Sequence, residues 1–163
     1  MYKYKNVLSW EDIRTMNEVM LGDSFPWYFY PNTVIKQDNN FMFVHMFVRN
    51  TKINSDFFYL LEPLLNYINE KKPYEKIERV KANLYTNQNK NIKHGSHHDL
   101  EKDNKNGFIS LFNLTTCNGS TIIDNKKHLS KKNELMIFDN VEHYGITQTD
   151  TQSRVCINFN FLT

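Results

Sequence analysis

The sequence predicts a mainly β protein whose N-terminal part contributes helices on one side of a barrel or sandwich. Helix-type patterns occur before residue 76, whereas short β-type segments separated by polar turns fill residues 77–163. A length of 163 residues suits one domain that can bury its own core. We therefore expect a single domain over 1–163, in which 1–76 supplies helical and strand support and 77–163 forms the β core.

Two helices are expected in the N-terminal part. Ser9 can cap the first, an acidic pair follows in its first turn, and Gly22 can end it. The second pattern is SDFFYLLEPLLNYINEKK (55–72), whose apolar residues recur at helical spacing and in which Pro63 marks a break or a second start. We expect this helix to pack on the outside of a sheet.

Two aromatic segments between these helices are typical of strands, namely FPWYFYPN (25–32) and FMFVHMFV (41–48). The aromatic side chains of FPWYFY are expected in the core, with a wall facing a substrate as the alternative. His45 lies within the apolar segment and is expected to be a buried histidine whose hydrogen bonds are satisfied.

Five later segments carry strand patterns: 77–85, 107–114, 120–123, 134–139 and 154–162. In the first of them, Val80, Ala82 and Leu84 alternate with polar or aromatic residues, as expected for a strand with two different faces. The polar stretches TTCNG and DNKKHLSKKN are expected to be turns.

Charge and cysteine content exclude several classes of protein. The net charge is +2, from 20 basic and 18 acidic residues, so a nucleic-acid partner is not favoured. Two cysteines do not form a secreted disulfide framework, and the N-terminus lacks a signal-peptide run. No stretch approaches 18 apolar residues, so no membrane partner is expected. These features predict a reducing, cytoplasmic location.

The stretch HGSHHDL (94–100) places His97 and Asp99 two positions apart, as two metal ligands at one strand end require. The tripeptide alone is also typical of a polar turn. His143 follows Asp99 after 43 intervening residues. Two imidazoles and one carboxylate on one face, with open positions opposite, suit non-haem Fe(II). A closed zinc site that used His94 would need more ligands nearby.

Arg154 opens the last strand pattern, RVCINFNFL. Val155, Ile157 and Phe159 share one face of that strand, and the other face carries the polar row Arg154, Cys156, Asn158 and Asn160. A polar row inside a barrel is expected only around a ligand cavity. The planar guanidinium of Arg154 would suit a carboxylate there.

The order of these elements resembles the 2-oxoglutarate- and Fe(II)-dependent oxygenases, and within them the prolyl 4-hydroxylase-like branch with its compact phage-encoded and bacterial members. The resemblance covers about half of the chain and rests on HHD (97–99), CNGSTII (117–123), NELMIFDN (133–140), His143 and Arg154. It implies a double-stranded β-helix, also called a jelly roll or cupin-like fold. The cytoplasm would then be that of a bacterium or a phage-infected host cell.

The resemblance also implies roles for individual residues. His97, Asp99 and His143 would bind Fe(II), and Arg154 would pair with the far carboxylate of 2-oxoglutarate, the cosubstrate used together with O2. Many relatives place a cosubstrate-contacting tyrosine on the strand that matches residues 107–114, where this chain has Ser-Leu-Phe-Asn in the middle. Tyr85 or Asn83, on the preceding strand, could supply that contact instead, or could serve in packing.

The implied activity is hydroxylation of a C–H bond, with a prolyl or other residue of a peptide or protein as the substrate that the branch suggests, and a small molecule as another. One alternative is an oxygenase that oxidises or demethylates a nucleobase. Another is a cupin-like module that binds metal without turnover.

Overall fold

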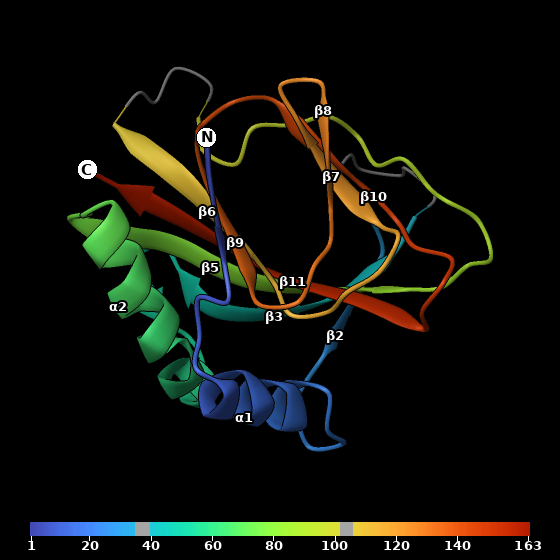
Figure 1. The fold of residues 1–163 in the computed structure, drawn as a ribbon, viewed down its shortest axis with the longest axis horizontal. Helices are drawn as coiled ribbons and strands as arrows, with labels where there is room; N and C mark the ends of the chain where they lie inside the picture. Colours follow the sequence, from blue (N-terminus) through green and yellow to red (C-terminus); the bar gives the residue numbers. More distant parts are fainter. Residues whose placement is uncertain (35–39, 102–105) are drawn as a thin grey trace.

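The computed structural model describes residues 1–34, 40–101 and 106–163. Two antiparallel sheets face each other, and the helices cover the outer face of the larger sheet (Figure 1). The larger sheet has the order β1 (Tyr2–Lys5), β9 (Glu134–Asp139), β6 (Gly107–Asn113), β11 (Ser153–Leu162), β5 (Lys76–Thr86), β3 (Met42–Arg49) and β2 (Tyr28–Tyr30), with β4 (Lys52–Ile53) paired to β3. The smaller sheet has the order β10 (His143–Ile146), β7 (Ser120–Ile123) and β8 (Lys126–Leu129).

The helices begin and end where their sequence signals predict. In α1 (Trp10–Met20), the Ser9 hydroxyl accepts a hydrogen bond of 3.1 Å from the Asp12 backbone. The helix ends before Gly22, where a Cβ atom would lie 2.6 Å from the Glu18 carbonyl oxygen. The second pattern divides into a 3-10 helix (Asp56–Leu61) and α2 (Glu62–Lys71), so Pro63 marks a second start.

The main core lies between the helices and the outer face of the larger sheet. Aromatic and branched residues of β5, β6 and β11 pack there against α1, the 3-10 helix and α2, among them Val80, Phe108, Phe159, Leu61 and Leu64. The inner face holds a smaller apolar cluster together with buried polar side chains. The larger sheet therefore separates a packed core from a polar interior.

The N-terminal residues contribute more to the sheets than the division at residue 76 suggests, because β1, β2 and β3 all belong to the larger sheet. The expected burial of the FPWYFY aromatics is confirmed for Phe25, which is buried, and is wrong for Tyr28, Phe29 and Tyr30, which are exposed on the edge strand β2. An edge strand has one free side, so its aromatic residues need not enter the core.

The stretch DNKKHLSKKN was expected to be a turn, and only part of it is. Asp124 and Asn125 form a tight turn with positive φ angles of 48° and 61°, and β8 then pairs with β7. The strand is polar and largely exposed, so it lacks the alternation by which a strand is predicted. The short strands β1 and β10 were also not predicted.

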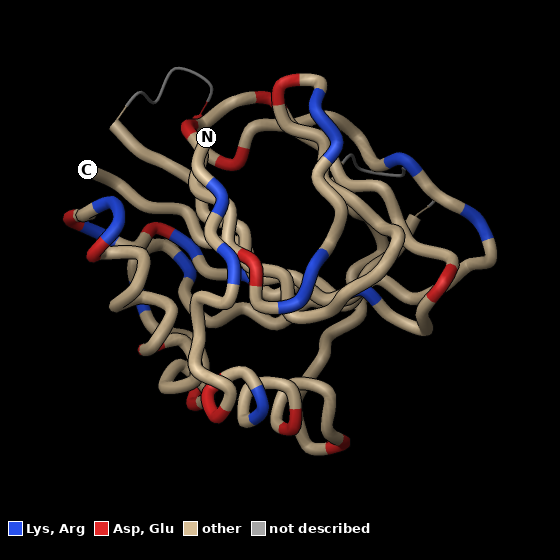
Figure 2. Tube along the Cα trace, viewed as in Figure 1, with Lys and Arg blue, Asp and Glu red and all other residues tan. Residues whose placement is uncertain are grey.

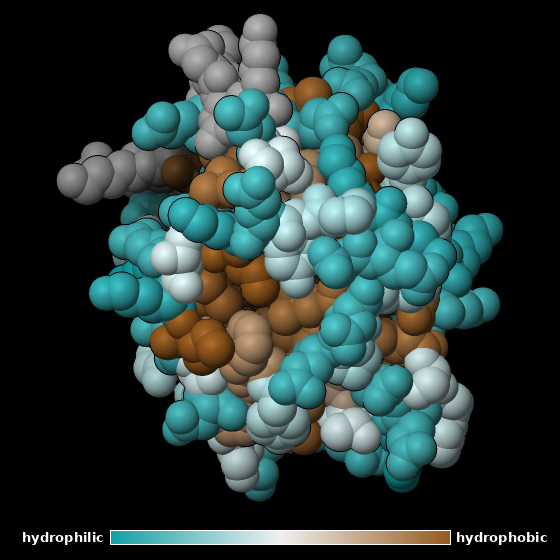
Figure 3. All heavy atoms as spheres, turned by 90° about the vertical axis from the view of Figure 1, so that its left-hand side faces the viewer, coloured by the Kyte–Doolittle hydropathy of each residue, from teal (hydrophilic) through white to brown (hydrophobic). Residues whose placement is uncertain are grey.

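Charged residues of both signs are interspersed along the trace (Figure 2). On the face shown in Figure 3, polar side chains surround smaller areas of apolar ones. Within the described residues, no helix has the length and apolar character needed to cross a membrane.

Candidate metal centre

His97 and His143 are brought together by paired backbones. The His97 amide donates to the His143 carbonyl oxygen and the His143 amide to the His97 carbonyl oxygen, both at 3.0 Å. The Nδ1 atoms of the two rings lie 3.2 Å and 2.9 Å from the carbonyl oxygens of Gly95 and Val141. Donation from Nδ1 to these carbonyls leaves the lone pair on Nε2, the atom that faces Asp99 in each ring.

Asp99 is held from three sides. Arg79 on β5 donates to Oδ1 at 2.6 Å, and the amide of Asn158 on β11 donates to Oδ2 at 2.8 Å. The amide of Asn160 donates to the Asp99 backbone carbonyl oxygen at 3.0 Å. These bonds fix both the backbone and the carboxylate of a residue that belongs to no strand.

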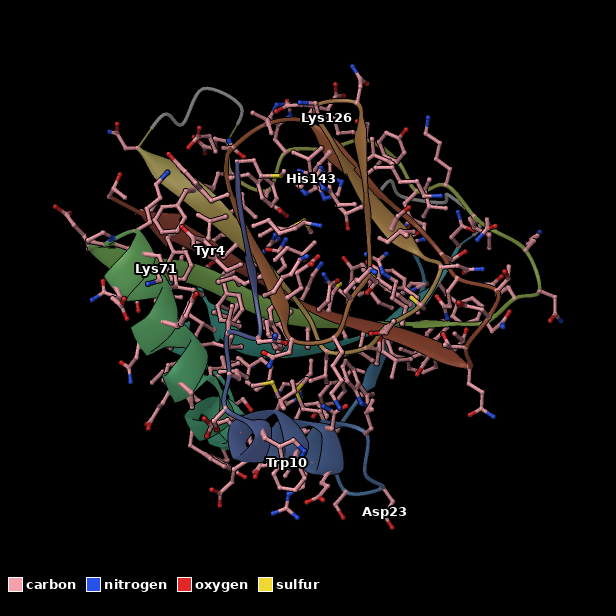
Figure 4. The ribbon with its side chains drawn as sticks, viewed as in Figure 1. Tyr4, Trp10, Asp23, Lys71, Lys126 and His143 are labelled. Carbon is pink, nitrogen blue, oxygen red and sulfur yellow. The ribbon has the colours of Figure 1, made fainter. Side chains whose placement is uncertain are left out.

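The structure thus gathers the three residues that the sequence pattern singled out as metal ligands. Oδ2 of Asp99 lies 3.1 Å from Nε2 of His143, Oδ1 lies 3.8 Å from Nε2 of His97, and all the ligand atoms fall within 4.8 Å of one another. His143 lies in the space between the two sheets (Figure 4). This donor set fits a divalent ion such as Fe(II).

Charges within the triad set the protonation of the candidate metal ligands. Burial alone would raise the pKa of Asp99, but the hydrogen bond and charge of His143, followed by the charge of Arg79, hold that pKa well below its usual range. Burial alone would lower the pKa of His143, but the hydrogen bond to Asp99 raises it. Burial lowers the pKa of His97. The cluster therefore keeps Asp99 as a carboxylate, and in the metal-free protein it favours a proton on His143 that a metal would have to displace.

Arg154 is buried on the inner face of β11, as the alternation along that strand predicts. One guanidinium nitrogen donates to the Thr121 hydroxyl at 2.8 Å, another lies 3.4 Å from the Ile146 carbonyl oxygen, and Nε has no hydrogen-bond partner. No carboxylate of the described residues lies within 4.0 Å of it. A Cβ atom on Gly119 would lie 2.9 Å from the Arg154 side chain, so a larger residue at this position would displace that side chain.

Tyr85 and Asn83 lie on the same inner face and line, with the triad and Arg154, a cavity of about 60 Å³. The guanidinium of Arg154 lies 5.6 Å from the centre of the Tyr85 ring. On β6, Leu111 is the residue that lines this cavity. The two candidate cosubstrate contacts are therefore placed beside the triad.

A larger cleft of about 1150 Å³ opens next to Asp99. The exposed aromatic residues of β2 line one part of it, and Arg79 and Lys81 of β5 line another. Tyr28, Phe29 and Tyr30, for which the sequence left a substrate-facing wall as the alternative, thus form part of the cleft beside Asp99. Lys81 lines both the cleft and the smaller cavity.

The other histidines have different roles. His45 is buried, with Nδ1 2.8 Å from the Pro26 carbonyl oxygen and Nε2 2.7 Å from the Ser55 hydroxyl, which confirms the expectation of a satisfied core histidine. His94 stacks on Tyr85 at a ring distance of 4.9 Å and does not join the triad. His98 lines neither cavity.

Sequence reasoning missed the contacts that hold Asp99. It placed Asn158 and Asn160 on the polar face of the last strand and left Arg79 among the residues that alternate with Val80, Ala82 and Leu84, without assigning any of them a partner. The signal was therefore present as strand alternation, but the pairing register was needed to bring Arg79 to Asp99.

No family model matches the sequence, and no curated protein matches it significantly. Solved structures do match. An oxidoreductase of the 2OG-Fe(II) oxygenase family from Burkholderia pseudomallei is 8% identical, with 97% of this chain and 82% of that chain covered at a TM-score of 0.69. A Pseudomonas putida prolyl-4-hydroxylase is 11% identical, with 99% and 92% covered at 0.61. A Trichoplax adhaerens prolyl hydroxylase, in complex with a hypoxia inducible factor peptide fragment, is 12% identical, with 99% and 82% covered at 0.67.

At identities of 8 to 12%, this likeness is one of fold. It extends over almost the whole chain, including the N-terminal residues that the sequence resemblance did not cover. The protein has the double-stranded β-helix fold that the sequence predicted, and it shares that fold with 2-oxoglutarate- and Fe(II)-dependent oxygenases, prolyl hydroxylases among them.

Proposed function

We propose that the protein is an Fe(II)- and 2-oxoglutarate-dependent dioxygenase that hydroxylates a C–H bond. The observation that carries this proposal is the buried guanidinium of Arg154, which has no carboxylate partner among the described residues and lines the cavity that holds the triad. An uncompensated buried cation costs free energy. A dicarboxylate that reaches both the metal and Arg154 would remove that cost.

His97, Asp99 and His143 would hold the metal, which together with 2-oxoglutarate and O2 would supply the oxidising power. One oxygen atom would enter the substrate, and the other would enter succinate as CO2 leaves. The work of the chain is to bind and orient. Arg154 would receive the far carboxylate, and Tyr85 or Asn83 would contact the cosubstrate nearer the metal. The two sheets would limit the access of water to the cavity between them.

We propose a peptide or protein residue, prolyl in the first instance, as the substrate. Support comes from the cleft of about 1150 Å³ beside Asp99, which has room for a chain segment, and from the peptide complex of the Trichoplax enzyme, which has the same fold. A nucleobase is less favoured, because the described residues in Figure 2 carry charges of both signs without a basic stripe.

Isothermal titration of the Mn(II)-loaded protein with 2-oxoglutarate tests the proposal. A charge-assisted bidentate pair contributes about 1.5–3 kcal/mol, so Arg154→Ala should raise the dissociation constant about tenfold to a hundredfold. Arg154→Lys should retain part of the affinity, because the charge remains. Arg14→Ala, on an exposed part of α1, is the matched control and should change nothing. A change below twofold for Arg154→Ala would remove the basis of the proposal.

Succinate release separates an enzyme from a module that only binds metal. Slow succinate formation that needs iron and oxygen, and that Asp99→Ala abolishes, is the expected result. Tight binding of 2-oxoglutarate without any succinate would identify a binding module.

A further inference from the structure

Lys81 is a mostly buried cation that the proposed function leaves without a role. It lies on the inner face of β5, in register with Met46 of β3 and Asn158 of β11. Its side chain borders both the triad cavity and the larger cleft. No carboxylate of the described residues lies within 4.0 Å of its ammonium group. The ammonium group therefore stands where the two cavities meet.

The neighbouring polar atoms also lack partners. The Oδ1 atoms of Asn83 and Asn158, which flank Lys81 along and across the sheet, are buried and accept no hydrogen bond from the described residues. Buried polar groups in proteins are normally paired, so unpaired ones grouped in a cavity point to a ligand. One cation and two hydrogen-bond acceptors suit a ligand that carries a negative group and, close to it, an N–H or O–H donor of its own.

The charges around the triad lead to the same conclusion. Arg79, Lys81 and Arg154 carry three positive charges, against the one negative charge of Asp99. A divalent metal adds two positive charges, and the 2-oxoglutarate dianion removes two. The loaded site would still hold a net positive charge. Glu78 and Glu101 line the outer cleft, but neither lies within 4.0 Å of Lys81. A further anion would therefore bind favourably.

Resting on the proposed function, we propose that Lys81 binds a carboxylate of the primary substrate, so that this substrate is a small acidic molecule or a peptide that carries an acidic residue near the one that is oxidised. The substrate would enter through the large cleft and place its carboxylate on Lys81, beside the open side of the triad. Burial, and then the charge of Arg79, lower the pKa of Lys81 to about 8, so the ammonium form persists at neutral pH and is further favoured by an anionic ligand.

Acetate, the simplest carboxylate, is the probe. In Mn(II)-loaded protein saturated with 2-oxoglutarate, paramagnetic relaxation of the acetate methyl protons reports acetate close to the metal, with acetamide as the neutral counterpart. The wild-type protein should relax acetate saturably, with an affinity about tenfold higher than for acetamide. Lys81→Met should remove this preference and Lys81→Arg should keep it. Lys52→Met, on the exposed strand β4, is the matched control.

Equal relaxation of acetate and acetamide, or an unchanged preference for acetate in Lys81→Met, would overturn this inference and leave the proposed function standing. So would a rise in the 2-oxoglutarate dissociation constant of Lys81→Met, because Lys81 would then serve the cosubstrate. Failure of the wild-type protein to bind Mn(II) or 2-oxoglutarate would overturn the proposed function and this inference with it.

A second experiment distinguishes a small acid from a peptide as the molecule that carries the carboxylate. Succinate release is compared with N-acetylglutamate, with a glutamate-containing pentapeptide, and with the same peptide carrying glutamine. Stimulation by N-acetylglutamate supports a small acid, and stimulation by the glutamate peptide alone supports a peptide. Stimulation by the glutamine peptide alone would contradict the requirement for a carboxylate.

Discussion

The two faces of the larger sheet are built from the same strands but have different roles, because one packs the core and the other lines the cavity. On β11, Val155, Ile157 and Phe159 of the outer face are fully buried in the main core. Arg154 and Asn158, which alternate with them, face the cavity and keep polar atoms without partners. The outer face thus gains free energy from apolar burial, whereas the inner face gives up part of that gain to remain able to bind.

Substitutions on the two faces should therefore have different effects on stability and on binding. Truncation of apolar side chains on the outer face should lower stability and leave the binding constants of folded molecules intact. Changes on the inner face should alter metal or cosubstrate binding, and some of them should raise stability, because sites built for ligands are strained without them.

Phe159→Ala should give the largest effect. Phe159 is fully buried and its ring stacks on that of Phe161 at 6.0 Å, so truncation should lower the free energy of unfolding by about 3–5 kcal/mol. Chemical denaturation measures this, and Mn(II) titration of the folded protein should give an unchanged dissociation constant. Weaker Mn(II) binding without loss of stability would show that the two faces are not independent.

Arg79→Met should weaken Mn(II) binding about tenfold to a hundredfold, because Arg79 orients the Asp99 carboxylate through its 2.6 Å contact. Arg49→Met is the matched control, since Arg49 lies opposite Arg79 in the sheet register but is exposed. Tighter binding in Arg79→Met would mean that charge repulsion between Arg79 and the metal outweighs its orienting role.

Acidification should weaken Mn(II) binding by up to about tenfold per pH unit, because the metal must displace the proton of His143. The pKa of His143 is raised, so the loss should begin above the usual histidine range, and affinity should level off above the raised value. The same shift stabilises the metal-free fold at low pH, and that contribution disappears as pH rises through the raised pKa. Titrations between pH 6 and 9 measure the profile, and a flat one would contradict it.

Asn83→Leu should have the smallest effect, a rise of about 0.5–2 kcal/mol in the unfolding free energy, because it removes a buried Oδ1 without a partner. It should also weaken 2-oxoglutarate binding. Ser110→Ala on the outer face is the matched control: its hydroxyl is likewise buried and unpaired, so stability should rise while cosubstrate binding stays constant. Equal 2-oxoglutarate affinities of the Asn83→Leu and Ser110→Ala variants would exclude Asn83 as a cosubstrate contact.

Much of the fold could be predicted because alternation reports the two faces of a buried strand. That pattern identified β5 and β11 and the inward direction of Arg154. It could not find β8, whose residues are mostly exposed on both faces, or place the aromatics of β2 at an edge, because composition does not distinguish a central strand from an edge strand.

The candidate site was predictable to the extent that its residues lie close in sequence or in a familiar order. His97 and Asp99 form such a pair, and His143 follows in a recognisable context. The pairing of Arg79 with Asp99 and the position of Lys81 between two cavities depend on strand register and on the course of a loop. Neither is encoded in a local pattern.

The reciprocal backbone bonds between His97 and His143 join segments that lie far apart in the chain, one leading out of the larger sheet and one belonging to the smaller. The Asp99 side chain is hydrogen-bonded to β5 and β11. A metal bound by Asp99 and the two histidine rings would therefore link the two sheets. An ion at a hundred times its dissociation constant adds about 2.7 kcal/mol to stability. The resistance of this barrel to heat or proteases would then follow the metal supply of the cell, so that molecules lacking metal would be the first to be degraded.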